Sequence, residues 1–401
     1  MTTRKILYVH HRPELGGAPQ SLRYLIEHLD RERFEPHVYC PPGPAARSFA
    51  EAGATIHHGE VAAFTHIWAS TYAGRRWLLF ARELLRAPRH ALSFTRLLRR
   101  HDFAVVHLND SPLVAAAAMA RREGIPVVLH LRSALASTGR IRSTVMRRLI
   151  HTLADETIAI NDDVAQSFGT TSEVIPNAVD LYRFKPAPAE TARKALALPL
   201  DRALVSFFGF VYPSKGFRDF IEAARLVKRM GVDALFLVVG GPVRDAEFFR
   251  TPVGRALSIA GLVSDHQREA EELVAELDLA ESVRFVPFTE DTVPMFQASD
   301  IVVAPSRGPE LGRPVLEACA CGRAVIATGS VTGGGILLPD ETGVLIPRRS
   351  PDALAVALKQ LIESPAERER LGANASVFAI SRFSARATAE KVMAIYERLL
   401  R

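Results

Sequence analysis

A chain of 401 residues, 48% of them hydrophobic, is long enough to form two domains with large cores. It contains no run of about 18 apolar residues, so the sequence predicts no membrane-spanning helix. The net charge of +6 lies within residues 1–184, mainly in two groups of arginines at 75–100 and 140–148. Few aromatic residues are interleaved with these arginines, so we do not expect a nucleic-acid partner.

The three cysteines, Cys40, Cys319 and Cys321, are a sparse and odd-numbered set. Cys319 and Cys321 flank a single residue in a predicted helix, a spacing that suits neither a disulfide nor a zinc site. The 13 histidines show no zinc-ligand spacing and no Asp-x-Asp motif occurs, so we expect no metal. The N-terminal residues lead into a strand without the apolar segment of a signal peptide. These features predict a cytoplasmic protein with reduced thiols.

Short apolar runs alternate with helical periodicity along the first half of the chain. Lys5–Val9 is a predicted strand, His10–Gly17 a loop, and Pro19–Leu29 a helix whose leucines share one face. Later strands are predicted at 104–107, 127–131 and 157–160. Because strands that alternate with helices form parallel sheets, this pattern predicts a parallel α/β domain.

Residues 75–100 carry eight arginines and one acid, Glu83. They are predicted to form two basic amphipathic helices, Arg75–Arg86 and Arg89–Arg100, separated by Pro88. Such helices can lie on an anionic membrane, where each basic residue contributes about 1 kcal/mol. Their apolar faces can equally pack on the N-terminal domain while the arginines are solvated, and the sequence leaves both interpretations open.

The segment 174–186 interrupts the alternation and is predicted to be a linker. A second series of strands follows, at 203–208, 234–239, 283–286, 301–304 and 324–328, and helices are predicted at 217–230, 352–362 and 385–401. We therefore expect an α/β protein with two Rossmann-like parallel-sheet domains facing each other across a cleft. The domains would comprise residues 1–184, completed by a C-terminal helix at about 384–401, and residues 185–383.

Two glycine-containing loops follow predicted strands. Gly16 and Gly17 lie before the first helix, where a backbone without side chains permits close approach of a ligand or simply a tight turn. In the second loop, Gly209 and Lys215 follow the strand 203–208, and a lysine there can neutralise a diphosphate or be an ordinary solvated residue.

Residues 304–318 combine a strand end, a polar loop with Arg307, and a helix that begins near Pro314. Backbone N–H groups at Leu311 and Gly312, near a helix N-terminus, form a suitable anion site. Glu310 and Glu317 are seven residues apart, and a glutamate in the first helical turn can accept hydrogen bonds from a ribose diol. The alternatives are a solvent-facing loop acid for Glu310 and a helix N-terminal acid for Glu317.

The strand 127–131 ends in His130 and Arg132, which alternate onto the same face. His107 and Asn109 end the neighbouring strand. These four side chains are candidates for the catalytic and acceptor side of a site, although His130 can equally be a buried, hydrogen-bonded histidine.

These segments resemble the signature of retaining glycosyltransferases of family 4, also called glycosyl transferases group 1. Gly209, Lys215 and Gly216 match the family's Gly-Arg-x-x-x-x-Lys-Gly loop, with Phe210 in place of the arginine. Leu311–Glu317 aligns with Phe-Gly-x-Pro-x-x-Glu, and Ile175–Asp180 is similar to Ile-Pro-Asn-Gly-Val-Asp. The family's first glutamate falls on Pro309, with Glu310 one position later.

The resemblance implies the GT-B fold and transfer of a sugar from a nucleotide sugar, with UDP as the default base, retention of configuration and no metal or other cofactor. It places the donor on the C-terminal domain and the acceptor on the N-terminal domain. Arg307, Arg313 or Arg132 would replace the missing phosphate-binding arginine. The implied catalytic residues are Glu310, Arg132 and His130; the donor residues are Gly16, Gly17, Gly209, Lys215, Arg307, Leu311, Gly312 and Glu317; His107 and Asn109 lie on the acceptor side.

Several functional questions stay open at the level of sequence. The acceptor is a glycan, a lipid-linked molecule or a small metabolite, and a lipid-linked acceptor would place the protein on the inner face of the membrane. A nucleotide-sugar epimerase of the same fold is an alternative enzyme. A non-catalytic nucleotide-binding scaffold is another alternative, because Phe210 and Pro309 replace two functional residues of the family.

Overall fold

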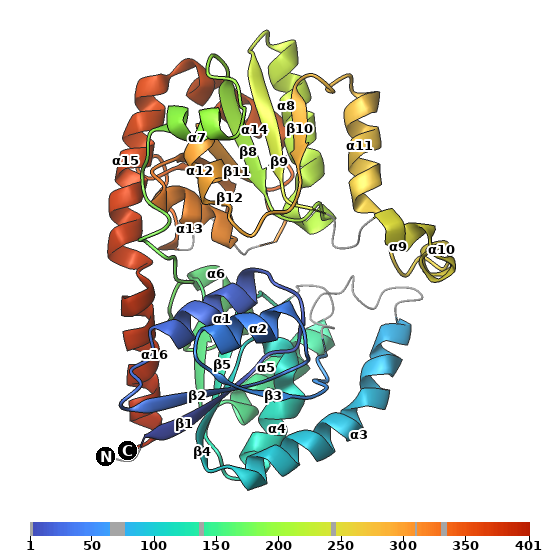
Figure 1. Cartoon of the computed structure of the whole chain (residues 1–401), viewed down its shortest axis with the longest axis vertical. Coiled ribbons are helices and arrows are strands. Elements are labelled where there is room, and N and C mark those ends of the chain that lie inside the picture. Colours follow the sequence, from blue (N-terminus) through green and yellow to red (C-terminus); the bar gives the residue numbers. More distant parts are fainter. Residues whose placement is uncertain (1–2, 65–76, 136–139, 242–245, 309–310, 330–334) are drawn as a thin grey trace. The chain divides into compact units, whose positions relative to one another are not determined.

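The computed structural model describes residues 3–64, 77–135, 140–241, 246–308, 311–329 and 335–401 (Figure 1). These residues form two compact units. Unit 1 comprises Met1–Ala178 and Phe383–Arg401, and unit 2 comprises Val179–Arg382. Each unit is a parallel sheet with helices on both faces, which confirms the predicted α/β class.

Unit 1 contains a seven-stranded parallel sheet in the order β3-β2-β1-β4-β5-β6-β7. Its central strands are short apolar runs whose side chains are almost all buried, as expected for a sheet covered on both faces. Three of the strands, β2, β3 and β7, were not predicted. The strands are β1 (Arg4–Val9), β2 (Phe34–Cys40), β3 (Thr55–His58), β4 (Phe103–Leu108), β5 (Val127–Leu131), β6 (Glu156–Ala159) and β7 (Glu173–Val174).

Two layers of helices cover this sheet. On one face α1 (Gly17–Glu27), α2 (Pro44–Glu51) and the C-terminal α16 (Ala385–Leu399) pack against alternate residues of the strands, including Ile6 and Tyr8. The opposite face packs against α3 (Trp77–Arg100), α4 (Val114–Arg122), α5 (Arg140–Leu153) and α6 (Asp162–Phe168). The helix α16 therefore belongs to the core of unit 1 although it follows unit 2 in the chain.

The prediction of two helices separated by Pro88 is wrong, because α3 runs without interruption from Trp77 to Arg100 with Pro88 inside it. A proline at this position removes the hydrogen bond to the Leu84 carbonyl. Leu84 and Pro88 are both exposed, so water can solvate the freed carbonyl and the helix continues. Arg75 and Arg76 lie outside the described residues.

Unit 2 contains a six-stranded parallel sheet in the order β10-β9-β8-β11-β12-β13. Apart from the short β13, each strand was predicted from its apolar run. The strands are β8 (Ala203–Phe208), β9 (Ala234–Val239), β10 (Val283–Val286), β11 (Ile301–Ala304), β12 (Ala324–Thr328) and β13 (Val344–Ile346).

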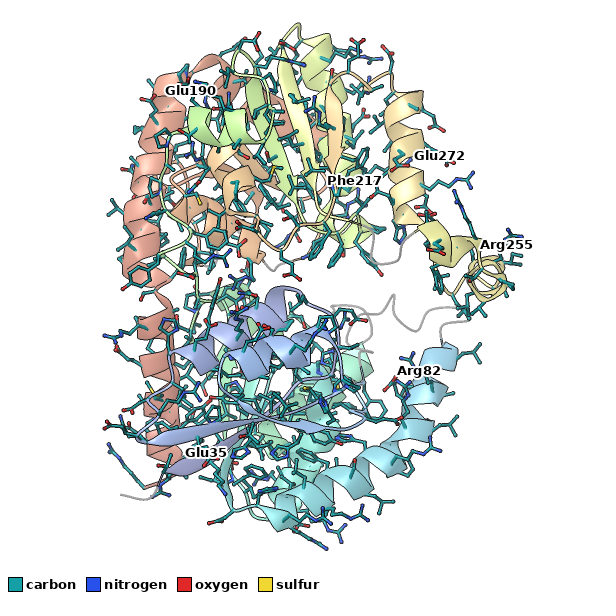
Figure 2. All side chains as sticks on the ribbon, in the orientation of Figure 1. Glu35, Arg82, Glu190, Phe217, Arg255 and Glu272 are labelled. Carbon is teal, nitrogen blue, oxygen red and sulfur yellow. The ribbon has the colours of Figure 1, made fainter. Side chains whose placement is uncertain are left out.

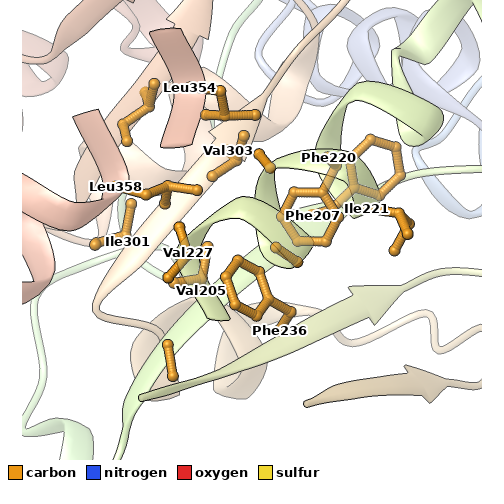
Figure 3. Close-up of a cluster of buried hydrophobic side chains, with 14 of the residues drawn as sticks. Val205, Phe207, Phe220, Ile221, Val227, Phe236, Ile301, Val303, Leu354 and Leu358 are labelled. Atoms are coloured by element: carbon orange, nitrogen blue, oxygen red, sulfur yellow. The ribbon is translucent and has the colours of Figure 1, made fainter. Parts of the chain in front are cut away.

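One face of this sheet packs against α8 (Phe217–Arg229), α11 (His266–Glu276) and α14 (Pro351–Glu363). Figure 3 shows part of this core, with labelled side chains from α8, α14 and the strands. The helices α12 (Val293–Ala298), α13 (Arg313–Ala320) and α15 (Pro365–Arg382) contact the strands from the other side. Shorter helices complete the unit: α7 (Ala189–Ala195), the 3-10 turn η4 (Pro213–Lys215), α9 (Ala246–Arg250) and α10 (Pro252–Ile259). Within the described ranges, every helix is too short or too polar to span a bilayer.

Each strand order reverses direction once. In unit 1 the chain moves outward from β1 in one direction and from β4 in the other, and in unit 2 the corresponding pair is β8 and β11. The loops that follow such a pair diverge over opposite faces of the sheet and leave room for a ligand between them. The candidate site residues are therefore expected after β1 and β4 in unit 1, and after β8 and β11 in unit 2.

The core of unit 2 provides a test of the packing. Phe220 is fully buried, with ring centroids 5.6 Å from both Phe207 and Phe236. Phe220→Ala is expected to lower the free energy of unfolding by about 3–5 kcal/mol, because it leaves a cavity in a packed core. Urea unfolding followed by circular dichroism measures this. Phe288 is 56% exposed, so Phe288→Ala should change stability by about 0.5 kcal/mol or less. Equal unfolding midpoints for the two variants would contradict this account of the core.

Candidate active site

In unit 2, the loops after β8, β9 and β11 approach each other at distances that only glycine permits. Gly209 follows β8, and a Cβ added to Gly240 would lie 2.3 Å from the carbonyl oxygen of Gly209. Gly216 has a φ of +74°, and a Cβ there would lie 1.7 Å from the carbonyl oxygen of Pro305. Gly216 is therefore required by the contact between the two loops at the point where the sheet reverses direction.

Lys215 extends from this loop toward the start of α13. Its Nζ lies 4.0 Å from the position that a Cβ on Gly312 would occupy, and Gly312 is the N-cap residue of α13. The ammonium therefore lies beside the free N–H groups at the positive end of a helix. Leu311, one residue earlier, is buried and anchors the loop. Cation and helix terminus together form a site suited to an anionic group such as a phosphate.

The two arginines of the β11–α13 segment are paired with acids. Arg307 donates from Nε and Nη2 to the Asp219 carboxylate of α8, at 3.0 and 2.6 Å. The hydrogen bonds that Asp219 accepts raise the pKa of Arg307. Lys215, in the neighbouring loop after β8, has no carboxylate partner among the described residues, so it is more available to a ligand than either arginine.

Glu317 lies one turn into α13 and is mostly buried. Arg313 donates to Glu317 Oε1 from Nε at 3.1 Å and from Nη2 at 2.9 Å, within one helical turn. This ion pair holds the Glu317 side chain along the helix, within two turns of the N-cap residue. A ribose diol that binds Glu317 would share the carboxylate with Arg313. Pro309 and Glu310, the position of the family's first glutamate, lie outside the described residues.

In unit 1, polar side chains follow three neighbouring strands on the face covered by α1 and α16. They are Tyr8 and His10 on β1 and after it, His107 and Asn109 on β4 and after it, and His130 and Arg132 on β5 and after it. The alternation of side chains along each strand puts all six on the same face. Four of the sequence-predicted site residues, His107, Asn109, His130 and Arg132, therefore come together in the structure.

Arg132 is the centre of this group. It is buried, and its Nε donates to Asn109 Oδ1 at 2.5 Å while Nη1 donates to Asn177 Oδ1 at 2.6 Å. Its Nη2 lies 3.4 Å from His130 Nδ1. Asn177 belongs to the segment that resembles the family's Ile-Pro-Asn-Gly-Val-Asp motif. The sequence pointed to this motif without revealing that its asparagine binds Arg132.

A carboxylate supports the same loops. Asp110 accepts hydrogen bonds from the Ser111 backbone N–H at 2.8 Å, from Ser133 Oγ at 3.1 Å and from the Arg132 backbone N–H at 3.4 Å. Burial raises the pKa of Asp110, and the hydrogen bonds that it accepts oppose this shift. Asp110 thus ties the residues after β4 to those after β5. It was not among the predicted site residues.

Gly16 and Gly17 form the start of α1, with Gly16 as N-cap. Gly16 has an extended φ of 168°, and a Cβ there would meet no atom within 4 Å. The fold of unit 1 therefore does not require glycine at this position, and the open space permits close approach of a ligand. The next residue, Ala18, accepts a hydrogen bond from Asn109 Nδ2 at 3.2 Å, which connects this loop to the Arg132 group.

The histidines of this group are neutral at physiological pH. Desolvation, reinforced by the positive charge of Arg132, lowers the pKa of His107 to about 3 and that of His130 well below its usual value. Burial likewise lowers the pKa of His10 well below its usual value. His130 can therefore act as a hydrogen-bonding group and not as a cation. No cluster of three or more His, Cys, Asp or Glu side chains suited to a metal ion occurs in the described residues.

Two family models match the chain in succession. Residues 15–183 match Glycosyltransferase Family 4, and residues 188–377 match Glycosyl transferases group 1. The boundary between the two matches, at 183–188, lies close to the boundary between the two units.

Curated relatives match part of the chain. The D-inositol 3-phosphate glycosyltransferase of Saccharomonospora viridis is 32% identical over 250 residues, which are 61% of this chain and 53% of the relative. The enzyme of the same name from Kineococcus radiotolerans is 32% identical over 240 residues, 56% of this chain and 51% of the relative. The chain thus matches about half the length of these relatives.

Solved structures match over nearly the whole chain. HepE from Anabaena, in complex with UDP, has a TM-score of 0.76 and 20% identity, covering 98% of this chain and 100% of HepE. Sucrose-phosphate synthase from Thermosynechococcus elongatus has a TM-score of 0.75 and 21% identity, covering 99% of both chains. This likeness shows the fold. With two parallel α/β units and consecutive matches to both family models, the chain belongs to the family 4 glycosyltransferases of the GT-B fold.

Proposed function

We propose that this protein transfers a sugar from a UDP-sugar to a hydroxyl group of an acceptor, with retention of anomeric configuration and without a metal ion. The observation that carries the proposal is the position of the Lys215 ammonium beside the N-terminus of α13, with Glu317 on the same helix. A diphosphate and a ribose are the two parts of a nucleotide sugar that such groups recognise. The choice of UDP is supported by HepE, which was solved with UDP and with UDP-glucose.

In this proposal unit 2 binds the donor. Lys215 and the N–H groups near Leu311 and Gly312 stabilise the negative charge that develops on the departing diphosphate. Glu317 accepts hydrogen bonds from the ribose, and Gly209 lets the backbone approach the donor. Arg307 supports the loop through Asp219. Catalysis then consists of positioning and charge stabilisation, and the departing phosphate takes the proton of the acceptor hydroxyl.

Unit 1 provides the acceptor side and the groups near the sugar. We assign Arg132 and His130 to hydrogen bonding of the reacting sugar, His107 and Asn109 to the support of these side chains, and the Gly16–Gly17 backbone to the donor phosphates. Glu310 is assigned to the sugar through the family signature. No residue of this scheme requires a cofactor.

The donor and the reaction type are tested together. Calorimetry with UDP, GDP, ADP and TDP identifies the base, and incubation with the corresponding sugar nucleotides then follows. Transfer only in the presence of an acceptor supports the proposal, and the inositol phosphates suggested by the names of the relatives are the first small acceptors to test. An altered sugar released from donor alone would instead identify an epimerase. Tight nucleotide binding without turnover would identify a scaffold.

The role of Lys215 is tested by Lys215→Ala. Because its charge matters more in the transition state than in the ground state, the variant is expected to lower kcat as well as raise KM for the donor, by at least about tenfold in kcat/KM. Lys228, an exposed lysine of the same unit paired with Asp278, provides the control: Lys228→Ala should leave both parameters unchanged. An effect on KM alone would reduce Lys215 to a ground-state binding group.

The ribose assignment is tested by Glu317→Gln. This change keeps an acceptor oxygen for Arg313 but removes the charge, so the fold is retained while nucleotide affinity falls by about 1.5–3 kcal/mol. Calorimetric titration with UDP measures the loss. Glu363→Gln, on the exposed side of α14, is the matched control. Unchanged affinity in Glu317→Gln would remove Glu317 from the donor site.

The basic helix α3 supports a further part of the proposal, contact with an anionic membrane that carries a lipid-linked acceptor. Phe94 and Leu98 lie on the buried side of α3, whereas Leu85 and Leu92 on the other side are 78% and 67% exposed. Leu78, Leu85 and Leu92 recur every seven residues, and each is followed four positions later by an arginine: Arg82, Arg89 and Arg96.

Residues at this spacing share one face of a helix, so the outward side of α3 alternates leucine and arginine. Its one acid, Glu83, is buried and pairs with Arg82, which is labelled in Figure 2. Exposed leucines beside Arg89 and Arg96, which have no carboxylate partner among the described residues, match the chemistry of an anionic bilayer surface. This surface favours a protein that is cytoplasmic and peripheral on the inner face of the membrane.

Flotation with anionic liposomes tests the membrane contact. Binding is expected at low salt and should decrease at high salt, because the arginines act through screened charges. Combined Leu85→Ser and Leu92→Ser changes, or Arg89→Gln and Arg96→Gln changes, should reduce it. Arg229→Gln with Arg348→Gln removes two exposed charges from unit 2 and should not. Absence of flotation of the parent protein at low salt would exclude this part of the proposal.

A further inference from the structure

The backbone pairing between β4 and β5 ends before the residues that form the site. The last paired residues are Leu108 and Leu129, so Arg132 lies beyond the end of this pairing. The carboxylate of Asp110, in the loop after β4, accepts a hydrogen bond from the Arg132 backbone N–H at 3.4 Å. A side chain therefore continues the connection between the two strands where the backbone pairing has ended.

Several hydrogen bonds converge on one oxygen of this carboxylate. Asp110 Oδ1 accepts from the Ser111 backbone N–H at 2.8 Å, from the Ser133 hydroxyl at 3.1 Å and from the Arg132 backbone N–H at 3.4 Å. The Ser111 hydroxyl lies 3.4 Å from the same oxygen, and the Ser133 hydroxyl lies 3.4 Å from Oδ2. Ser111 follows β4, whereas Arg132 and Ser133 follow β5, so Oδ1 holds the two loops together.

These contacts do not depend on the protonation state of Asp110. A backbone N–H can only donate, so Oδ1 must accept from Ser111 and Arg132 whether the carboxyl group is charged or neutral. Any proton on Asp110 is therefore carried by Oδ2. An asparagine at this position can place its carbonyl oxygen at the Oδ1 position and its amide nitrogen at the Oδ2 position, and so retain the same hydrogen bonds.

The preceding residue in the chain holds the side chain of Arg132. Asn109 Oδ1 accepts from Arg132 Nε at 2.5 Å. Two consecutive residues thus hold Arg132, Asp110 by its backbone and Asn109 by its guanidinium. Without the Asp110 carboxylate, the loops after β4 and β5 would lose the contacts that join them. The backbone of Arg132 would then shift relative to Asn109, and the guanidinium would shift with it.

We propose that Asp110 is a positioning residue that fixes the backbone of Arg132 and Ser133 and thereby the place of the Arg132 guanidinium. The proposal rests on the proposed function only for the role of Arg132 in sugar transfer, and it gives Asp110 no contact with the sugar. It requires the hydrogen bonds of Asp110 and not its charge, so asparagine should replace Asp110 and alanine should not.

A second carboxylate of unit 1 provides the matched control. Asp155 accepts from the Val127 backbone N–H at 2.8 Å and from Arg121 Nη1 at 2.6 Å. Val127 is the first residue of β5, so Asp155 holds the opposite end of the strand that leads to Arg132. Asp155→Ala should therefore lower the stability of unit 1 without a shift of the Arg132 guanidinium.

NMR of the Arg132 side chain in the full-length protein tests the positioning without a substrate. The Nε–H resonance, identified by its loss in Arg132→Lys, should exchange slowly with solvent in the parent because of the bond to Asn109. Asp110→Ala should shift this resonance and raise its exchange rate at least about tenfold, whereas Asp110→Asn and Asp155→Ala should change that rate less than about twofold.

Ser133→Ala removes one of the bonds to Oδ1 and leaves Asp110 in place, so it should shift the Arg132 resonance in the same direction by a smaller amount. This variant decides the question if Asp110→Ala does not fold. An unchanged Arg132 resonance in Asp110→Ala, or in Ser133→Ala where only that variant folds, would overturn the proposal.

Kinetics provide the second measurement. Asp110→Ala is expected to lower kcat about tenfold while the donor KM changes less than about twofold, because unit 2 is assigned most of the donor contacts. Asp110→Asn should keep kcat within about threefold of the parent, and Asp155→Ala should change neither parameter. Equal losses of kcat in Asp110→Ala and Asp110→Asn, or a shifted resonance with unchanged kcat, would refute the positioning role. If no donor supports turnover in the parent, the proposed function fails, and the NMR spectra still decide whether Asp110 positions Arg132.

Discussion

A buried guanidinium that can only donate hydrogen bonds imposes the order seen in the interior of unit 1. Arg132 needs acceptors on every side, because an unsatisfied buried cation is far too costly to maintain. Asn109 and Asn177 turn their carbonyl oxygens toward it. Because its oxygen accepts from Arg132, Asn109 directs its amide nitrogen to His10, after β1, and to the Ala18 carbonyl in the first turn of α1. One cation thereby determines the orientation of side chains from three strands.

Unit 2 depends on a different constraint, the close approach of backbones. The Gly216 and Pro305 loops meet where no side chain fits, and this contact brings Lys215 to the start of α13. The position of the cation is thus a consequence of steric exclusion more than of any attraction. The charge of Lys215 then adds to the positive end of α13 in a loop arrangement that Gly216 makes possible. Arg307, whose charge is neutralised by Asp219, contributes to the shape of the same loop.

Sequence reasoning succeeded where one local signal dominates. The strands β8, β9 and β11 are uninterrupted apolar runs, and their limits were predicted to the residue. It failed where tertiary packing overrides a local signal: Pro88 was taken as a break, although an exposed proline is tolerated in the long α3. The hydrogen-bond partners of the site residues could not be predicted either. Asn177 contacts Arg132 and Tyr396 contacts His107 from distant parts of the chain, and no periodicity or spacing encodes such contacts.

The place of α16 in unit 1 has a consequence for the order in which the protein can fold. The sheet face that includes Ile6 and Tyr8 is complete only when Val392 and Tyr396 pack on it, and these residues emerge from the ribosome after all of unit 2. Unit 2 is contiguous in sequence, so its core can form during synthesis. The sheet of unit 1 is synthesised earlier but keeps one apolar face exposed until α16 has been made. A chaperone that binds nascent chains would therefore bind to this exposed apolar face of unit 1.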